Sequence, residues 1–180
     1  MRTPRAVLAA CVLLVLTACG TSAADRASGA GNQAAASRAA GTADSATRFG
    51  ETYRFRSGIL VAVSEPTRFQ PSDAAYPASK DAIAFEVWVR NETGRPYRLS
   101  RMAVTVTAGG TVTKQIIDPT QGYTGVVSSA KGLPPDCEKQ VDLAFAVPEK
   151  PGRLKVKFQP HQTRPASVTY IGEPRHGDSR

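Results

Sequence analysis

Hydrophobic and polar residues alternate with a period of two along most of the chain beyond residue 52. Such alternation is typical of β-strands that bury one face and expose the other. The clearest run covers residues 82–90, in which Ile83, Phe85, Val87 and Val89 share one face. Shorter runs of this kind lie at 53–55, 59–63, 104–106, 111–113, 125–127, 141–147, 154–158 and 168–171. The pattern predicts seven to nine short strands and no stable helix.

Turn-forming residues separate these runs. Gly109-Gly110 lies between two of them and predicts a two-residue hairpin, while Pro151-Gly152 turns the chain between two later runs. Short strands with turns at this spacing are typical of an antiparallel β-sandwich of immunoglobulin type. A small β-barrel is the alternative architecture. The cysteine–tryptophan–cysteine arrangement of antibody domains is absent.

The beginning of the chain has the organisation of an export signal. A short basic segment, residues 1–5, precedes an apolar stretch over residues 6–16 that is too short to cross a bilayer as a permanent helix. The following Leu16-Thr17-Ala18-Cys19 resembles the lipobox of bacterial lipoproteins, which implies cleavage before Cys19 and lipid attachment to it. We therefore expect a lipid anchor at the extracytoplasmic face of the cell membrane. An ordinary secreted protein is the alternative.

This interpretation divides the chain into four parts. Residues 1–18 form the signal peptide, and residues 19–47 form the lipidated cysteine and a flexible linker rich in Ala, Gly, Ser and Thr. The linker has no apolar period with which to fold, and as a coil it would hold the domain roughly 30 Å from the membrane on average. Residues 48–171 form the sandwich domain, which is long enough to bury a core of its own, and residues 172–180 form a disordered tail.

The positive net charge of the chain favours anionic partners. The formal net charge is +8, which falls to +6 when Arg2 and Arg5 leave with the signal peptide. Outside a cell, such a balance favours lipid headgroups, anionic envelope polymers or acidic proteins. The export signal argues against a nucleic-acid partner.

Three segments of the predicted domain carry a family resemblance: Phe-Glu-Val-Trp-Val-Arg-Asn at 85–91, Leu-Pro-Pro at 133–135 and Leu-Ala-Phe-Ala-Val-Pro at 143–148. They resemble the immunoglobulin-like domain of unknown function common in Gram-positive, and especially actinobacterial, lipoproteins, which is related to a small secreted mycobacterial antigen. In that family one strand ends in Asn and a late strand ends in Val-Pro. The resemblance covers about residues 53–171 and implies a sandwich fold without known catalysis. The chain departs from it at Pro135-Asp136-Cys137, where relatives more often have a Pro-Gly turn.

Few residues of the chain suggest catalysis. His161 follows a proline in a predicted loop, His176 lies in the tail, and no nucleophile motif accompanies either. We therefore predict no catalytic residue, no cofactor and no enzymatic activity. Cys137 is the one cysteine of the predicted domain, so no disulfide can form within it. Its thiol is partly buried and inert, or reactive, or paired with another molecule, and we favour the first of these.

A carrier of a small ligand or of a metal ion such as copper is the alternative function for an exported β-sandwich. Copper carriage requires clustered soft ligands, and in this chain Cys137, Met102 and His161 would have to converge. Because soft ligands normally occur in recognisable groups, we predict no metal site.

The strand predicted at residues 82–90 carries candidate binding residues on its outward face. Trp88 and Arg90 lie on the face of their strand opposite Phe85 and Val87. An exposed tryptophan there would be a strong binding anchor, unless a loop or a neighbouring strand covers it.

Basic side chains supply further candidates. Lys155 and Lys157 point outward from their predicted strand, where they either contact an anionic surface or form a solvated face. A second basic cluster contains Arg95, Arg98 and Arg101, and residues 66–80 are expected to form an irregular binding loop. We expect a membrane-anchored, non-catalytic binding or scaffold module whose partner is an envelope protein or an anionic envelope polymer. The candidate contacts are Trp88, Arg90, Lys155 and Lys157.

Overall fold

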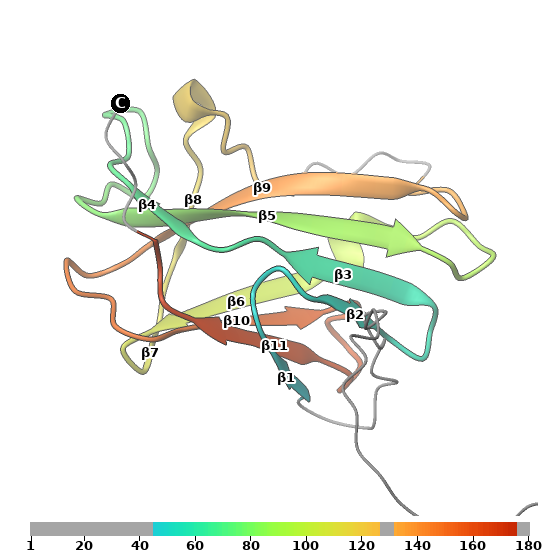
Figure 1. The fold of residues 1–180 in the computed structure, drawn as a ribbon. Coiled ribbons are helices and arrows are strands. Elements are labelled where there is room, and N and C mark those ends of the chain that lie inside the picture. Colours follow the sequence, from blue (N-terminus) through green and yellow to red (C-terminus); the bar gives the residue numbers. More distant parts are fainter. Residues whose placement is uncertain (1–44, 127–131, 176–180) are drawn as a thin grey trace, which may run out of the picture. The chain divides into compact units, whose positions relative to one another are not determined.

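The computed structural model describes residues 45–126 and 132–175, which belong to one compact unit, Ala35–Arg180. The predicted signal peptide, Cys19, most of the linker, Val127 and His176 lie outside the described residues. The described chain forms two β-sheets with hardly any helix (Figure 1). This confirms the predicted all-β sandwich.

The larger sheet has six strands in the order β2-β3-β5-β9-β8, with β4 also paired to β5. Its strands are β2 (Thr52–Arg54), β3 (Ile59–Val63), β4 (Thr67–Phe69), β5 (Ala82–Asn91), β8 (Gln115–Ile116) and β9 (Glu138–Ala146). All neighbours in this sheet are antiparallel. β3 and β4 pair with successive parts of β5, so the two short strands follow one edge of the longest strand.

The smaller sheet has five strands in the order β1-β11-β10-β6-β7. They are β1 (Ser45–Thr47), β6 (Ala103–Ala108), β7 (Thr111–Val112), β10 (Leu154–Gln159) and β11 (Val168–Gly172). β1 runs parallel to β11, with Ser45 beside Val168, and the other pairs are antiparallel.

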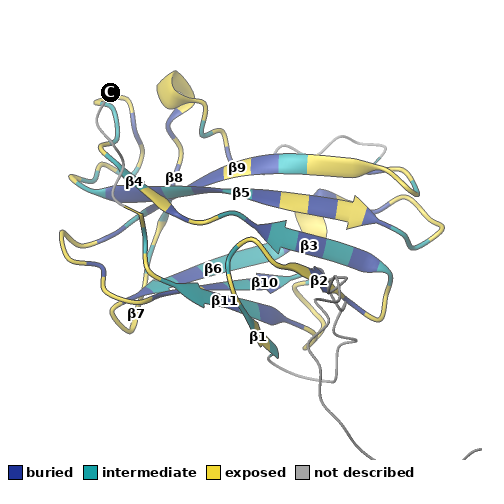
Figure 2. Cartoon of the chain, in the orientation of Figure 1, coloured by how far each residue is buried: buried dark blue, intermediate teal, exposed yellow. Residues whose placement is uncertain are grey.

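Side chains along the strands alternate between buried and exposed positions, and Figure 2 shows this as alternating bands along β5. In β10, Leu154, Val156 and Phe158 are buried. Burial of apolar surface is the main force that favours folding. Because apolar residues alternate with polar ones along each strand, each sheet has one apolar face, and the two apolar faces pack against each other.

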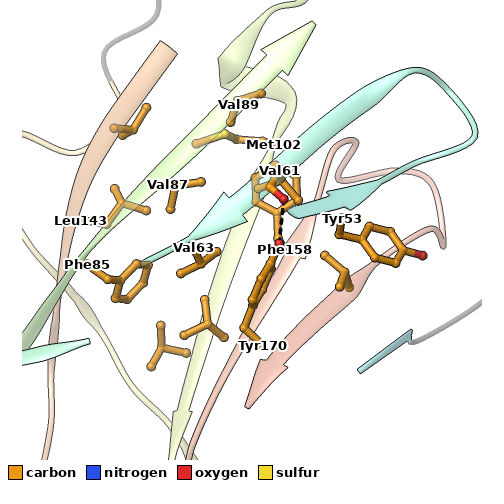
Figure 3. Close-up of a cluster of buried hydrophobic side chains, with 14 of the residues drawn as sticks. Tyr53, Val61, Val63, Phe85, Val87, Val89, Met102, Leu143, Phe158 and Tyr170 are labelled. Carbon is orange, nitrogen blue, oxygen red and sulfur yellow. Dashed lines mark hydrogen bonds between the residues drawn. The ribbon is translucent and has the colours of Figure 1, made fainter. Parts of the chain in front are cut away.

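The core lies between the inner faces of the two sheets. Val61, Val87 and Leu143 from the larger sheet belong to the same buried cluster as Phe158 and Tyr170 from the smaller one (Figure 3). The Tyr170 hydroxyl donates a hydrogen bond of 2.8 Å to the carbonyl oxygen of Val61 and thereby links the two sheets.

The predicted hairpin is confirmed, since Ala108 pairs with Thr111 and both intervening glycines have positive φ. In two other respects the structure departs from the predicted strands. The predicted run at 125–127 was wrong in its described part, because Gly125 has a φ of 75°, outside the β region, and Val126 is irregular. The structure adds the short strands β1, β4 and β8, so part of the predicted irregular loop 66–80 is a strand.

Two groups of connections close the ends of the sandwich. We call one the arginine end; it consists of segments 55–58, 92–102, 132–137 and 160–167. We call the other the far end; it consists of segments 64–81, 109–126, 147–153 and 173–175, and we count the short strands β4, β7 and β8 with these connections. Two single 3-10 turns, η1 (Leu99–Arg101) and η2 (Pro119–Gln121), lie in these connections. Within the described ranges, no helix has the length and apolar character needed to span a bilayer.

Candidate functional site

Trp88 lies on the outer face of the larger sheet, near the middle of β5. Its neighbours Val87 and Val89 are buried in the core, and parity therefore turns the indole ring outward, where it is 38% exposed. Ala62 of β3 and Gln140 of β9 are its cross-strand partners. The tryptophan is flanked by strands on both sides but is not covered.

A shallow hollow of about 350 Å³ opens beside this ring. β3 contributes half-buried Leu60 and Ala62, and the adjacent β2 contributes Thr52. Arg90 and Glu138, which are paired across β5 and β9, line the hollow toward the arginine end. We call this arrangement the Trp88 hollow. It has an aromatic wall, a small apolar floor and a charged rim.

Two sets of polar contacts stabilise the Trp88 hollow. The indole Nε1 donates a hydrogen bond of 3.1 Å to the Glu86 carboxylate. Arg90 lies 3.2 Å from the Glu92 carboxylate, which Arg54 also contacts. These charges are partly exposed, so the pairs orient the side chains more than they stabilise the fold.

A second hollow, of about 340 Å³, lies farther along the same outer face, toward the far end. Its lining includes the carboxylates of Glu65, Glu86 and Asp142. Glu65 forms an ion pair with Arg175, and Asp142 accepts a hydrogen bond of 2.9 Å from Gln140. Among residues 45–126 and 132–175, no three His, Cys, Asp or Glu side chains are grouped so that they could hold a metal ion.

The structure divides the predicted binding residues between the two sheets. Trp88 and Arg90 share the outer face of the larger sheet, whereas Lys155 and Lys157 lie on β10 in the smaller sheet. Lys155 is exposed and Lys157 is half-buried. The four residues therefore do not form a single surface.

The side chains considered for copper lie in different surroundings. Met102 is buried in the core cluster (Figure 3), whereas Cys137 is an exposed free cysteine. The His161 ring lies edge-on to Tyr97, with 5.8 Å between the ring centroids. Burial lowers the pKa of His161, and the charges of Arg164 and Arg101 lower it further.

Two buried polar residues were not predicted from the sequence. Asn91, at the end of β5, donates from Nδ2 to the carbonyls of Arg95, Leu133 and Pro134, at 2.8, 2.9 and 3.1 Å. Asp118 accepts hydrogen bonds from the Ser72 amide and hydroxyl, at 2.8 and 2.7 Å. An Asn followed two residues later by Thr was a local signal for a turn at Asn91. No local signal marked Asp118, because its partner is 46 residues away in sequence.

The far end also exposes apolar side chains that were not predicted. Tyr76 is 79% exposed and Ile117 is 36% exposed, and their backbones are hydrogen-bonded to each other in both directions at 2.8 Å. Phe69 and Tyr123 pack together nearby, with ring centroids 4.8 Å apart, and flank a small second core that contains Ile116.

No protein-family model and no curated protein sequence matches the chain. The crystal structure of yjhA from Bacillus subtilis is similar, with a TM-score of 0.50 and 11% identity over 72% of this chain and 99% of yjhA. The crystal structure of ycdA from Bacillus subtilis, a protein classed as a lipoprotein, has a TM-score of 0.47 and 18% identity over 64% of this chain. The chain spans only 36% of the length of ycdA, and that similarity is too weak to support an argument. The similarity to yjhA shows the fold alone.

Proposed function

We propose that this protein is a lipoprotein anchored through Cys19 at the extracytoplasmic face of the membrane, and that its sandwich binds an envelope protein through the Trp88 hollow. The proposal assigns no catalytic residue and no cofactor. The observation on which it depends is the outward, partly exposed position of Trp88 on an otherwise ordinary sheet face.

The lipid anchor is supported by the order of basic segment, apolar segment and Leu16-Thr17-Ala18-Cys19 at the start of the chain. We also propose kinship with the immunoglobulin-like domains of actinobacterial lipoproteins. This is supported by the two-sheet fold, by Asn91 as the last residue of β5, and by Val147-Pro148 directly after β9.

The composition of the Trp88 hollow fits a protein partner. Tryptophan is enriched among the few interface residues that contribute most of the binding free energy, and such residues are typically surrounded by a polar rim. The hydrogen bond to Glu86 restrains the ring before binding, which reduces the entropy lost when the partner arrives. The shallow depth favours an apolar side chain of a protein over an enclosed small ligand.

In-cell photocrosslinking tests the binding site. A photoreactive amino acid replaces Ala62, which lies beside Trp88, and a control replaces Thr105, on β6 of the other sheet. We expect a discrete crosslinked product from position 62, no such product from position 105, and loss of the product on Trp88→Ala. Removal of a central tryptophan typically weakens an interface on the order of 30-fold or more. The same products from both positions, or products that persist in Trp88→Ala, would refute the Trp88 hollow as the contact.

The anchor is tested separately. Cys19→Ser is expected to leave the chain unlipidated and to shift the protein out of the detergent-extracted membrane fraction, while mass spectrometry of the native protein is expected to show a diacylglyceryl group on an N-terminal Cys19. A native protein that begins at another residue without lipid would refute the anchor and leave the crosslinking result to be judged alone.

A further inference from the structure

The connections that close the two ends of the sandwich differ in charge. Those of the far end carry six basic and six acidic residues: Arg68, Lys80, Lys114, Lys150, Arg153 and Arg175 against Glu65, Asp73, Asp81, Asp118, Glu149 and Glu173. Those of the arginine end carry five basic and two acidic residues: Arg56, Arg95, Arg98, Arg101 and Arg164 against Glu92 and Asp136. In the described connections, the excess positive charge is therefore at one end.

Four of these basic side chains are exposed and form no ion pair with any described residue; we call Arg95, Arg98, Arg101 and Arg164 the arginine cluster. The acidic residue of the same segment, Glu92, is bound by Arg54 and Arg90 on the sheet face instead. Asp136 is the other acidic residue of the arginine end, so the described connections there keep an excess of three positive charges.

Two connections that are distant in sequence bring the arginine cluster together. The Tyr97 hydroxyl donates a hydrogen bond of 2.6 Å to the Pro160 carbonyl, 63 residues away, and the Gln162 amide donates to the Arg101 carbonyl at 2.9 Å. His161 lies between these contacts, and burial together with two guanidinium charges lowers its pKa, which favours the uncharged ring. The charge of this surface therefore comes from guanidinium groups.

The chain joins the sandwich at this same end. β1 is parallel to β11, and Ser45 lies beside Val168, the first residue after the connection 160–167. Residues 19–44 separate Ser45 from the proposed lipid on Cys19. As the coil that its composition predicts, a segment of that length would span roughly 30 Å on average, so an anchored sandwich would keep its arginine end within reach of the bilayer.

We propose that the arginine end docks on the anionic headgroups of the membrane that holds the lipid anchor, with the arginine cluster against lipid phosphates. Guanidinium groups match phosphate oxygens in charge and in geometry. The anchor turns docking into an intramolecular event, so weak attraction suffices. The inference rests on the proposed anchor and adds an orientation to it: Tyr76 and Ile117, at the far end, face away from the bilayer.

The expected strength follows from the number of charges. A basic residue near an anionic leaflet contributes about fivefold to the partition coefficient, so any three of the four arginines contribute on the order of 100-fold. Salt weakens the attraction, because the screening length falls from about 10 Å at 0.1 M to about 3 Å at 1 M.

Energy transfer from Trp88, the single tryptophan of the chain, to a dansyl lipid measures docking directly. The native lipidated protein is reconstituted into vesicles of phosphatidylcholine alone or with phosphatidylglycerol. We expect more transfer in the anionic vesicles, and loss of that difference at 1 M salt, where the screening length is about 3 Å.

A matched pair of variants places the effect at one end. One triple variant carries Arg98→Gln, Arg101→Gln and Arg164→Gln. It is expected to abolish most of the difference in energy transfer between the anionic and the neutral vesicles. The control variant carries Lys114→Gln, Lys150→Gln and Arg153→Gln, which remove the same charge from the far end. It is expected to preserve the difference in energy transfer. Equal transfer in both vesicles, or equal effects of the two triple variants, would overturn the docking surface.

Failure of the anchor gives a different result. If the protein is recovered without lipid, sedimentation of residues 19–180 carrying Cys19→Ser with the same vesicles tests the surface, since the described fold begins at Ser45. Binding to anionic vesicles that is lost in the arginine variant supports the surface without the anchor. Binding to a soluble polyglycerol phosphate but not to vesicles would replace the membrane by an anionic polymer as the ligand.

Discussion

At the arginine end the side chain of Asn91 joins two connections, and at the far end the side chain of Asp118 does the same. Both side chains are fully buried, and both form hydrogen bonds with backbone groups of another connection. They differ in chemistry: Asn91 is neutral and donates to three carbonyls, whereas Asp118 accepts from an amide and a hydroxyl.

The net charge of the surrounding connections differs in the opposite order. Those around neutral Asn91 carry unpaired arginines, whereas those around the charged Asp118 are balanced in charge and expose Tyr76 and Ile117. The interior of each end thus serves stability, while its surface is free to differ. Substitutions inside either end are therefore expected to change folding, and substitutions on the surface to change binding.

The largest expected effect is that of Asn91→Ala. The carbonyls of Arg95, Leu133 and Pro134 would lose their shared donor and keep only their bonds from Thr93, Tyr97 and Cys137. Each lost hydrogen bond contributes about 1 kcal/mol. We expect the free energy of unfolding to fall by about 3 kcal/mol in a denaturant titration. Asn91→Asp keeps the size but places an acceptor against those carbonyls, so it is expected to destabilise as well. A variant pair as stable as the native protein would show that the arginine end is not held by this residue.

A smaller effect is expected for Tyr97→Phe. This change removes the hydroxyl that joins segments 92–102 and 160–167 and leaves the Pro160 carbonyl without that donor. We expect a loss of about 1 kcal/mol in the free energy of unfolding, measured by thermal or chemical denaturation. Tyr76→Phe is the control, because Tyr76 is mostly exposed at the far end and no comparable loss is expected. Equal effects of the two substitutions would mean that the bond to Pro160 does not stabilise the arginine end.

Much of the sandwich was predictable because its long strands follow a local rule. β5 and β10 each alternate over six or more residues, which is long enough for the period to be seen. β1, β4 and β8 contain two or three residues each and exist through pairing with a longer strand. A strand of that length leaves no periodic signal of its own.

The candidate site was predictable only one residue at a time. Parity along β5 predicted that Trp88 points outward, and the structure places it there. The floor of the hollow could not be predicted, because Leu60 and Ala62 reach it through the pairing of β3 with β5. Likewise, Arg164 joins Arg101 through contacts between segments about 60 residues apart, which no local pattern encodes.

The smallest expected effect is a pH dependence of stability, which Asp118 gives to the far end and Asn91 does not give to the arginine end. Burial acts to raise the pKa of Asp118, but hydrogen bonds from the Ser72 hydroxyl and amide, together with those from the Gln121 and Thr120 backbone, outweigh it and hold the pKa below its ordinary value. A carboxylate whose pKa is lowered on folding stabilises the native state above its unfolded pKa of about 3.9. That contribution disappears as the pH falls through the lower, folded value.

Asp118→Asn is therefore expected to lower the thermal midpoint at neutral pH, and the gap from the native protein is expected to close in acid. Asp73→Asn removes the same charge from an exposed position of segment 64–81 and is expected to show no such closing gap. A gap for Asp118→Asn that stays constant from neutral to acid pH would mean that the substitution acts through packing and not through the charge. Asn91 does not titrate, so the gap for Asn91→Ala is expected to be independent of pH over the same range, and the buried charge at the far end alone would account for the difference.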